Sequence, residues 1–326
     1  MSLPSELAAV RGAVRRSLPE ADDRPVLVAC SGGADSLALL SAAVFESRDR
    51  PHRVIGVTVD HGLQAGSADR ADAVVAQMVR IGVDETVGVR VTVEGSGQGP
   101  EAAAREARYA VLEEVAERFD ASVVLLGHTR DDQAETVMLG LTRGSGGRSL
   151  AGMRPAFDTF RRPLLDVSRA QTEAACLAEG LEWWTDPHNS DPAYTRARIR
   201  NVVMPTLERE LGPGVAETLA RTAAQLRADV ELLDAQAAAA YDELLSHGEL
   251  PVDRLDTLPE ALRLRVLRLA ALRAGAIPSD LTHGHVLAVD QLVRRWRGQV
   301  GVDLPGKLRA VRRAGRVAFV TSDRSA

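Results

Sequence analysis

The chain has 326 residues, 45% of them hydrophobic and 26% charged, which is an ordinary composition for a folded globular protein and a length that suits two domains. No apolar run approaches the roughly 18 residues of a membrane helix, and the first residues lack the basic and apolar regions of a secretory signal. The net charge of −5 excludes a globally basic nucleic-acid binder, and Cys30 and Cys176 form no Cys-x-x-Cys, so we expect a reduced, cytoplasmic protein.

The first part of the chain alternates apolar, strand-like runs with helical patterns. We predict strands at 26–30, 54–59, 87–93 and 122–127, and helices near 5–17, 34–47, 67–81, 101–119 and 132–142. Near-continuous apolar strands separated by helices are typical of a parallel sheet that is covered on both faces. The predicted fold class is therefore α/β, a doubly wound, Rossmann-like parallel sheet, followed by a smaller, mostly helical C-terminal domain.

The composition changes after Pro205. The Gly- and Arg-rich stretch 143–168 is predicted as a long loop, and helices are predicted at 214–245, 259–274 and 282–297, before a small hairpin within 301–320 that turns at Gly315-Arg316. We place the two domains at 1–210 and 211–326. Eight basic residues and one acid lie between Arg294 and Arg316, which is a local basic patch in an acidic chain.

Residues 31–36 read Ser-Gly-Gly-Ala-Asp-Ser between the first predicted strand and the helix after it. Gly32 and Gly33 allow backbone N–H groups to approach an anion, and the helix adds the positive end of its dipole. The Gly-Lys-Ser/Thr of the common P-loop is missing. Such a cradle suits pyrophosphate as a leaving group, and Asp35 could hold its Mg²⁺, although an ordinary strand–turn–helix would show the same hexapeptide.

Polar residues follow two further strands, and ligands of such sheets bind outside the carboxyl ends of the strands. Asp60-His61-Gly62 follows the second strand, where turn chemistry alone is the alternative, and His128 follows the fourth. After His128, either Asp131 or Asp132 shares a helical face with Glu135, which could hold Mg²⁺ or the ammonium of an amine substrate. The alternative is helix capping, because Thr129 and Asp132 have the spacing of a capping box.

Two groups of arginines lie near these segments. Arg108 follows Glu101 and Arg105 on one predicted helix and could stabilise charge on a phosphate; a solvated helix face is the alternative. The other group follows Tyr194 and suits phosphate contacts and base stacking, with a solvated surface run as the alternative; it contains Arg196, Arg198 and Arg200.

Taken in chain order, these motifs resemble the tRNA(Ile)-lysidine synthetase (TilS) family of the PP-loop ATP-pyrophosphatases, whose fold is adenine nucleotide alpha-hydrolase-like. The resemblance covers about residues 25–210, and the remainder looks like the family's short form. The chain departs from the family's pattern at Pro100 and Ala197, where asparagine is usual. The matching segments are Ser31–Ser36, Asp60–Leu63, Glu101–Tyr109, Gly127–Thr136, Arg143–Met153, Arg162–Leu165 and Asp186–Arg196.

The resemblance implies that ATP adenylates carbon 2 of the wobble cytidine in the CAU anticodon of tRNA(Ile), and that free lysine then displaces AMP. It implies ATP-binding at Ser31, Gly32, Gly33, Ala34, Asp35, Ser36, Asp60 and His61, with Asp35 also holding Mg²⁺. Arg108 would face the activated intermediate, and lysine would be bound by Asp131, Asp132 and Glu135 beside His128. The tRNA would be bound by Arg196, Arg198, Arg200, Arg312 and Arg313. We also allow for a homodimer, because the sequence does not specify the oligomeric state.

Three other functions share parts of this pattern. A tRNA thiolation enzyme would use cysteines for sulfur transfer or cluster binding, and no such motif is present. A small-molecule amide ligase would not need the basic C-terminal patch. A nucleotide-sensing or RNA-binding module would keep the cradle but would not need the acids at Asp35, Asp132 and Glu135.

Overall fold

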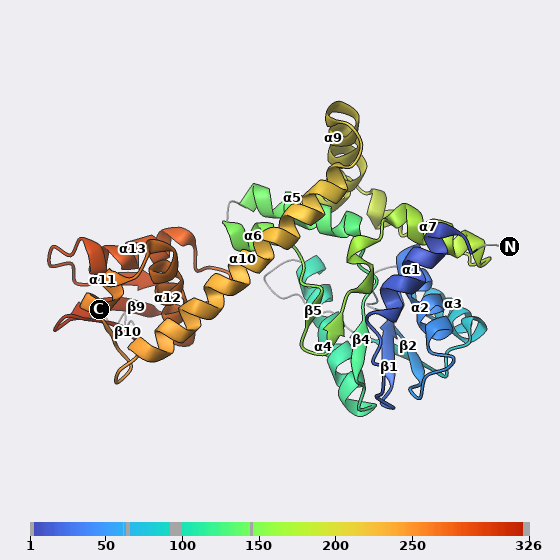
Figure 1. Cartoon of the computed structure of the whole chain (residues 1–326), viewed down its shortest axis with the longest axis horizontal. Helices are drawn as coiled ribbons and strands as arrows, with labels where there is room; N and C mark the ends of the chain where they lie inside the picture. Colours follow the sequence, from blue (N-terminus) through green and yellow to red (C-terminus); the bar gives the residue numbers. More distant parts are fainter. Residues whose placement is uncertain (1–2, 61, 63–65, 92–99, 144–145, 322–326) are drawn as a thin grey trace. The chain divides into compact units, whose positions relative to one another are not determined.

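The computed structural model describes residues 3–60, 62, 66–91, 100–143 and 146–321. The chain divides into two compact units (Figure 1). The first contains Met1–Leu139 and Gly152–Thr222, and the second contains Gly140–Ala151 and Ala223–Ala326. Within the described ranges, no helix combines the length and the apolar character that crossing a membrane requires.

The first unit is built on a six-stranded sheet with the order β3-β2-β1-β4-β6-β5. Parallel pairs join β1 (Val26–Ala29) to β2 (Val54–Asp60) and β4 (Val123–Leu125), β2 to β3 (Glu85–Arg90), and β4 to β6 (Phe160–Arg161). Only β5 (Ala156–Phe157) runs antiparallel, against β6. The predicted α/β class with a parallel sheet is thereby confirmed, and its four long helix–strand repeats begin and end within a few residues of the predicted positions.

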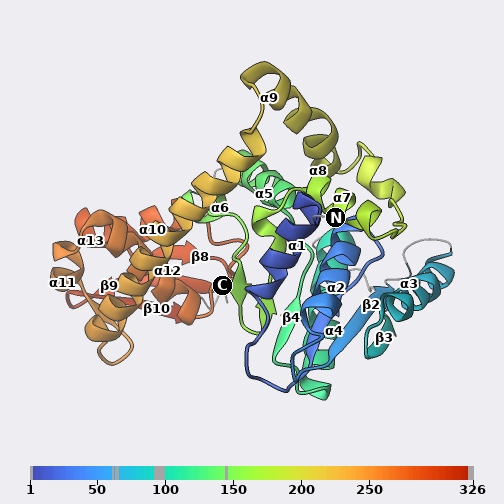
Figure 2. The same cartoon turned by 45° about the vertical axis from the view of Figure 1, so that its right-hand side comes forward.

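Helices cover both faces of this sheet because its central strands are apolar on both sides (Figures 1 and 2). On one face, Val26 and Val28 of β1 pack with α1 (Ser5–Arg15), α2 (Ala34–Glu46), α3 (Ser67–Ile81) and α7 (Arg169–Ala178). On the other, Leu27 packs with Leu112 and Val115 of α4 (Pro100–Arg118). The polar segments follow the carboxyl ends of β1, β2 and β4.

The stretch 143–168 is not the long loop that its composition predicts. It contains α6 (Gly147–Leu150), the β5–β6 hairpin and a 3₁₀ turn, η1 (Pro163–Asp166), and α7 follows directly. The strands of the hairpin are two residues long, too short for a period-two pattern to show in the sequence. They are held by tertiary packing instead, since the ring of Tyr109 on α4 lies against those of Phe157 and Phe160, with centroids 5.9 and 5.2 Å away.

The connection to the second unit is helical. After η2 (Pro187–Ser190), the chain forms α8 (Thr195–Arg198), a π-helical turn η3 (Ile199–Val203), α9 (Met204–Leu211) and α10 (Val215–Leu244), in this order. The last of these begins in the first unit and ends in the second, so no break in helical pattern marks the boundary between the units.

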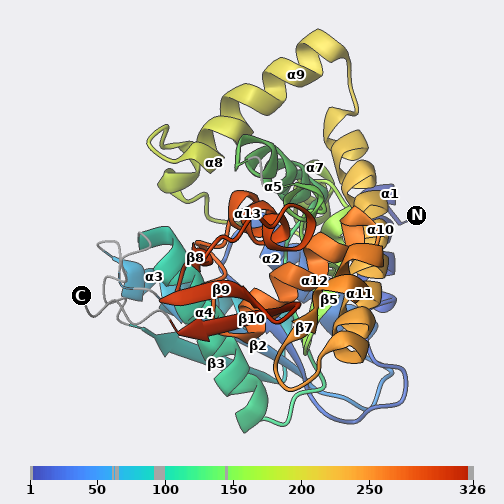
Figure 3. The same ribbon diagram turned by 90° about the vertical axis from the view of Figure 1, so that its left-hand side faces the viewer.

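The second unit packs α11 (Val252–Thr257), α12 (Glu260–Arg273) and α13 (His283–Arg294) with an antiparallel sheet (Figure 3). The sheet has the order β7 (Leu250–Pro251), β10 (Arg316–Thr321), β9 (Leu308–Arg313), β8 (Val302–Leu304). The predicted hairpin is present as β9–β10 and turns at Ala314-Gly315, both with positive φ. It is not isolated, because β7 (Leu250–Pro251), which lies well before the hairpin in sequence, and β8 extend it to four strands.

Candidate active site

The cradle between β1 and α2 is shaped by one glycine and one serine. Gly32 has φ +81°, and a Cβ there would lie 2.6 Å from Val74 Cγ2, so the position excludes other residues. Ser36 Oγ accepts a hydrogen bond from the Ser31 N–H at 3.1 Å and donates one to the Gly33 carbonyl at 2.9 Å. No side chain caps the start of α2 at Gly33, so its first N–H groups remain available to an anion.

The carboxyl end of β4 touches this turn, and that of β2 belongs to the strand next to β1. A Cβ on Gly127 would stand 3.1 Å from both the backbone nitrogen and the Cα of Ser36, so the end of β4 touches the cradle. At the end of β2, Asp60 accepts from the Gly62 N–H at 2.9 Å and pairs with Arg90 at 2.9 Å. His61 lies outside the described residues. The convergence of the strand ends that the sequence predicts is therefore present for β1 and β4.

Behind the cradle, two carboxylates of α5 (Arg130–Arg143) meet three guanidinium groups. Glu135 accepts from Arg200 Nε at 2.7 Å and from Arg196 Nε at 2.8 Å, and its side chain is only 2% exposed. Asp132 Oδ1 lies 3.1 Å from Nη2 of both Arg169 and Arg200 and 3.4 Å from Arg196 Nη2. We call these five residues the carboxylate–guanidinium cluster. Its partners come from α5, α7, α8 and η3.

The two oxygens of Asp132 have different tasks. Oδ2 accepts from the backbone N–H of Thr129 at 2.8 Å and from its hydroxyl at 3.0 Å, which is the helix-capping role that sequence leaves open. Oδ1 faces the arginines, so capping and a site role are both served by the same carboxylate. Asp131 lies apart from this face: its Oδ2 accepts from the backbone N–H of Arg169 at 2.8 Å, at the start of α7.

Asp35 connects the cradle to the cluster. Its carboxylate accepts a hydrogen bond from the Thr172 hydroxyl and lies 3.6 Å from Arg169 Nε. Burial raises the pKa of Asp35 to about 6, against the opposing effects of Thr172 and Arg169, and the charge of Asp132 adds to the rise. With Asp35 included, three carboxylates face three arginines, so the formal charges of these six side chains balance.

His128 is held as a neutral imidazole. Burial lowers the pKa of His128 well below its usual range, and Arg162 and Arg105 add to that effect while Asp132 opposes it. Its Nδ1 accepts a hydrogen bond from Arg162 Nε at 3.3 Å, which assigns the remaining proton to Nε2. His128 can therefore donate one hydrogen bond from Nε2 to a ligand.

The other arginines that the sequence singles out are placed differently. Arg108 is exposed on α4. Arg198 does not join the cluster: it donates to the carbonyls of Pro192 and Ala193 and to the Thr195 hydroxyl. In the second unit, Arg312 donates to the Leu292 and Val293 carbonyls at the end of α13, whereas Arg313 is exposed.

Arg169 and Thr172 are the site residues that sequence reasoning missed. Both lie on α7, within the stretch where no helix was predicted. A local signal was present, because Ser168 and Gln171 form a capping box, with Ser168 accepting from the Gln171 N–H. Among the described residues, no group of three His, Cys, Asp or Glu side chains is arranged to hold a metal ion.

Comparisons with known proteins agree with this geometry. A family model for the PP-loop domain matches residues 8–207, and one for the TilS substrate binding domain matches residues 250–318. A tRNA(Ile)-lysidine synthase of Thermobifida fusca is 53% identical over 98% of this chain and 99% of its own length. The chain belongs to the tRNA(Ile)-lysidine synthase family. The synthase of Salinispora arenicola is 54% identical, over 98% of both chains.

Membership confirms the resemblance seen in the motifs and makes the chain one of a family of ligases that use ATP through a PP-loop. The U34-tRNA thiolase NcsA of Methanococcus maripaludis is similar in structure, with a TM-score of 0.58 over 68% of this chain and 80% of its own. At 19% sequence identity, that similarity concerns the fold. It confirms the adenine nucleotide alpha-hydrolase-like architecture of the first unit.

Proposed function

We propose that this chain ligates free lysine to carbon 2 of the wobble cytidine of tRNA(Ile) with a CAU anticodon, through an adenylated intermediate, and releases AMP and pyrophosphate. The observation that carries the proposal is that Arg169 links Asp35, in a phosphate cradle without a P-loop lysine residue, to the buried carboxylates Asp132 and Glu135 of α5. The cradle suits the pyrophosphate leaving group, and the carboxylates suit the ammonium of an amino-acid substrate.

The cradle would hold the phosphates of ATP. Ser36 keeps the turn closed, Gly32 gives the backbone its close approach, and the N–H groups at the start of α2 face the anion. A single carboxylate is enough for Mg²⁺ when phosphates supply further oxygens, so Asp35 fits as its protein ligand. Mg²⁺ bound there would neutralise charge on the departing pyrophosphate. Asp60 would contact the nucleotide from the end of β2, and His61 is proposed with it.

Lysine would be bound by Asp132 and Glu135. The guanidinium groups of Arg169, Arg196 and Arg200 pair with Glu135 at the position where an ammonium would bind. ATP phosphates compete for the same guanidinium groups, so ATP binding would release the carboxylates for lysine. The pair would then hold lysine and accept the proton that its attacking amine must lose.

The neutral His128 would serve the reaction as a hydrogen-bond donor. Since Arg162 occupies its Nδ1, His128 can offer only Nε2–H to the negative charge that develops on the cytidine or the phosphate. Arg108 is proposed to face the same intermediate from α4. Asp131 would act on lysine indirectly, by fixing the start of α7 and with it Arg169.

The tRNA would be bound by the arginines that follow Tyr194 in the first unit and by the basic patch between Arg294 and Arg316 in the second. Arg198 and Arg313 suit direct phosphate contacts. Arg196 and Arg200 would contact the tRNA only through N–H groups that are not used in their ion pairs with Glu135. Arg312 would contribute indirectly, because its side chain donates to the last carbonyls of α13. A cytoplasmic location agrees with two buried free thiols, Cys30 and Cys176. A homodimer stays a prediction.

The deciding experiment measures pyrophosphate release from ATP with tRNA(Ile) and lysine, each omitted in turn. Release should require tRNA, and mass spectrometry of the digested tRNA should show lysine attached to one cytidine. Release that is independent of tRNA would contradict the proposal and favour a small-molecule ligase. A product that contains sulfur instead of lysine would favour tRNA thiolation.

A further inference from the structure

A second binding feature lies on the α4 side of the site and begins with a buried cation. Arg162 is 7% exposed, yet its guanidinium contacts only neutral acceptors. It donates to the Arg154 carbonyl at 2.6 Å, to the Tyr109 hydroxyl at 3.0 Å and to His128 Nδ1 at 3.3 Å. Among the described side chains, no carboxylate pairs with it, and burial lowers the pKa of Arg162. A buried charge without a counterion is costly unless a ligand supplies one.

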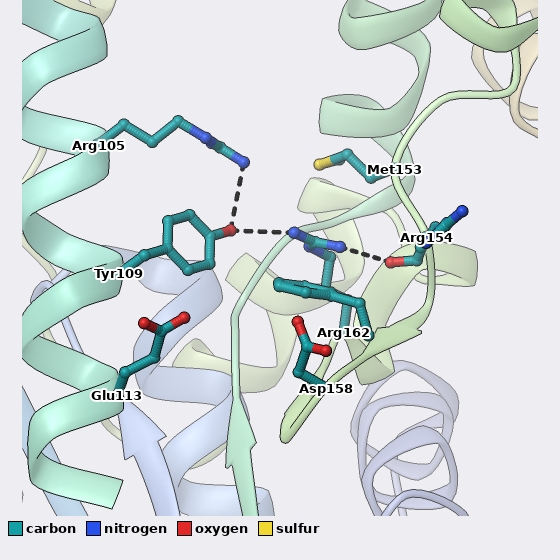
Figure 4. Close-up of a pocket in the computed structure, with 8 residues that line it drawn as sticks. Arg105, Tyr109, Glu113, Met153, Arg154, Asp158 and Arg162 are labelled. Atoms are coloured by element: carbon teal, nitrogen blue, oxygen red, sulfur yellow. Dashed lines mark hydrogen bonds between the residues drawn. The ribbon is translucent and has the colours of Figure 1, made fainter. Parts of the chain in front are cut away.

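Arg162 also forms the inner wall of a cavity of about 550 Å³ (Figure 4). Figure 4 shows a chain of hydrogen bonds along this wall, from Arg105 to the Tyr109 hydroxyl and on to Arg162 and Arg154. The aromatic surface comes from Tyr109 and Phe157. The cavity is lined by three arginines and by two acids, Glu113 and Asp158, so its formal charge is positive.

We propose that this cavity binds an unpaired nucleotide of the tRNA that directly adjoins the modified cytidine, with its base on the Tyr109–Phe157 surface and its phosphate toward the arginines. Aromatic rings and guanidinium planes are the side chains on which unpaired RNA bases stack. The cavity shares Arg162 with His128, so a nucleotide in it lies one side chain from the reaction centre. This inference rests on the proposed function, since it takes the target cytidine to lie at His128.

The test compares the binding of tRNA(Ile) to the full chain and to variants of α4. Arg105→Gln and Tyr109→Leu should weaken binding by about 10-fold each, since a stacked base contributes on that order. Tyr109→Phe should retain most of the affinity because it keeps the ring. The matched control is Arg118→Gln, which removes the same charge from the exposed far end of α4, about 20 Å away at 1.5 Å per residue, and should bind as the wild type does.

Two tRNAs with one abasic nucleotide, either 5′ or 3′ of the target cytidine, complete the test. On one of them the effect of Tyr109→Leu should vanish, because the base it supports is gone. The inference is overturned if the effect persists on both, or if Arg105→Gln and Arg118→Gln bind alike. The Tm separates a folding defect from a lost contact, since a folding defect lowers the Tm of the variant and the loss of a tRNA contact leaves it unchanged. Formation of lysidine by the wild type is scored separately, so failure of the proposed function is seen independently.

Discussion

The carboxylate–guanidinium cluster predicts that ATP and lysine bind cooperatively. Without nucleotide, lysine must displace arginines that lie 2.7–3.1 Å from Glu135 and Asp132. Phosphates that engage the same arginines remove that competition. Lysine affinity should therefore rise when a non-hydrolysable ATP analogue is present, and the analogue's affinity should rise by the same factor when lysine is present.

The sharpest perturbation is Arg200→Gln, because Arg200 makes two contacts to Glu135, at 2.7 and 3.0 Å, and one to Asp132 at 3.1 Å. Coupling free energies of this kind are about 1–3 kcal/mol, or about 5- to 150-fold in affinity. We expect the wild type to bind lysine about 10-fold more tightly with the analogue than without it, which is about 1.4 kcal/mol. In Arg200→Gln, lysine should bind about as tightly without the analogue as the wild type does with it.

The assay is equilibrium dialysis of labelled lysine with and without saturating analogue. Arg198→Gln is the matched control, since Arg198 lies two residues away, carries the same charge and, among the described residues, donates to Pro192, Ala193 and Thr195 instead of the cluster. Arg200→Gln also leaves buried carboxylates less compensated, so its Tm should fall and added lysine should restore part of the loss. An analogue that leaves the lysine affinity of the wild type unchanged would refute the reasoning, as would identical behaviour of Arg200→Gln and Arg198→Gln.

Four further predictions concern the cradle and the basic patch. At sub-saturating Mg²⁺, pyrophosphate release should decline as pH falls through about 6, because the proton and Mg²⁺ compete for Asp35, whose pKa burial raises to about 6. Because the pKa of Asp35 is raised in the folded protein, ionised Asp35 lowers the free energy of unfolding above pH 6. Asp35→Asn should therefore abolish turnover and yet raise the free energy of unfolding at pH 7, by about 3 kcal/mol at most, at roughly 1.36 kcal/mol per pKa unit. A lower Tm for the variant would contradict this. In chemical denaturation, Gly32→Ala should lose more stability than Gly180→Ala. Both substitutions cost about 1–2 kcal/mol because the glycine has a positive φ, but only at position 32 would the added Cβ clash, with Val74 at 2.6 Å. Equal losses would show that Val74 moves to relieve the clash. Arg313→Glu should weaken tRNA binding and flatten its salt dependence while leaving ATP binding unchanged; an unaltered salt slope would assign Arg313 to ordinary surface.

Much of the fold was predictable because it is encoded in long, local patterns. The strands β1 and β4 are apolar throughout, and β2 has polar side chains only at Thr58 and Asp60. The helices between these strands run for 13 to 19 residues, long enough for their period to stand out. The short elements were missed for the opposite reason. The hairpin β5–β6 and the two-residue β7 have no period to detect, and the packing of Phe157 and Leu250 decides them.

For the site, sequence by itself determined which chemistry is available and roughly where. Residues 31–36 and 127–135 follow strands whose carboxyl ends meet at one edge, so topology brings Asp35, His128 and Glu135 to the same place. Only the tertiary structure decided which charges pair. Glu135 lies 61 and 65 residues from Arg196 and Arg200, and no local rule selects those arginines over Arg198, which points elsewhere. The raised pKa of Asp35 and the neutral state of His128 likewise depend on burial and on neighbours from α7 and from Arg162, because electrostatic free energy depends on distance in space and on solvent exclusion, which sequence spacing does not determine.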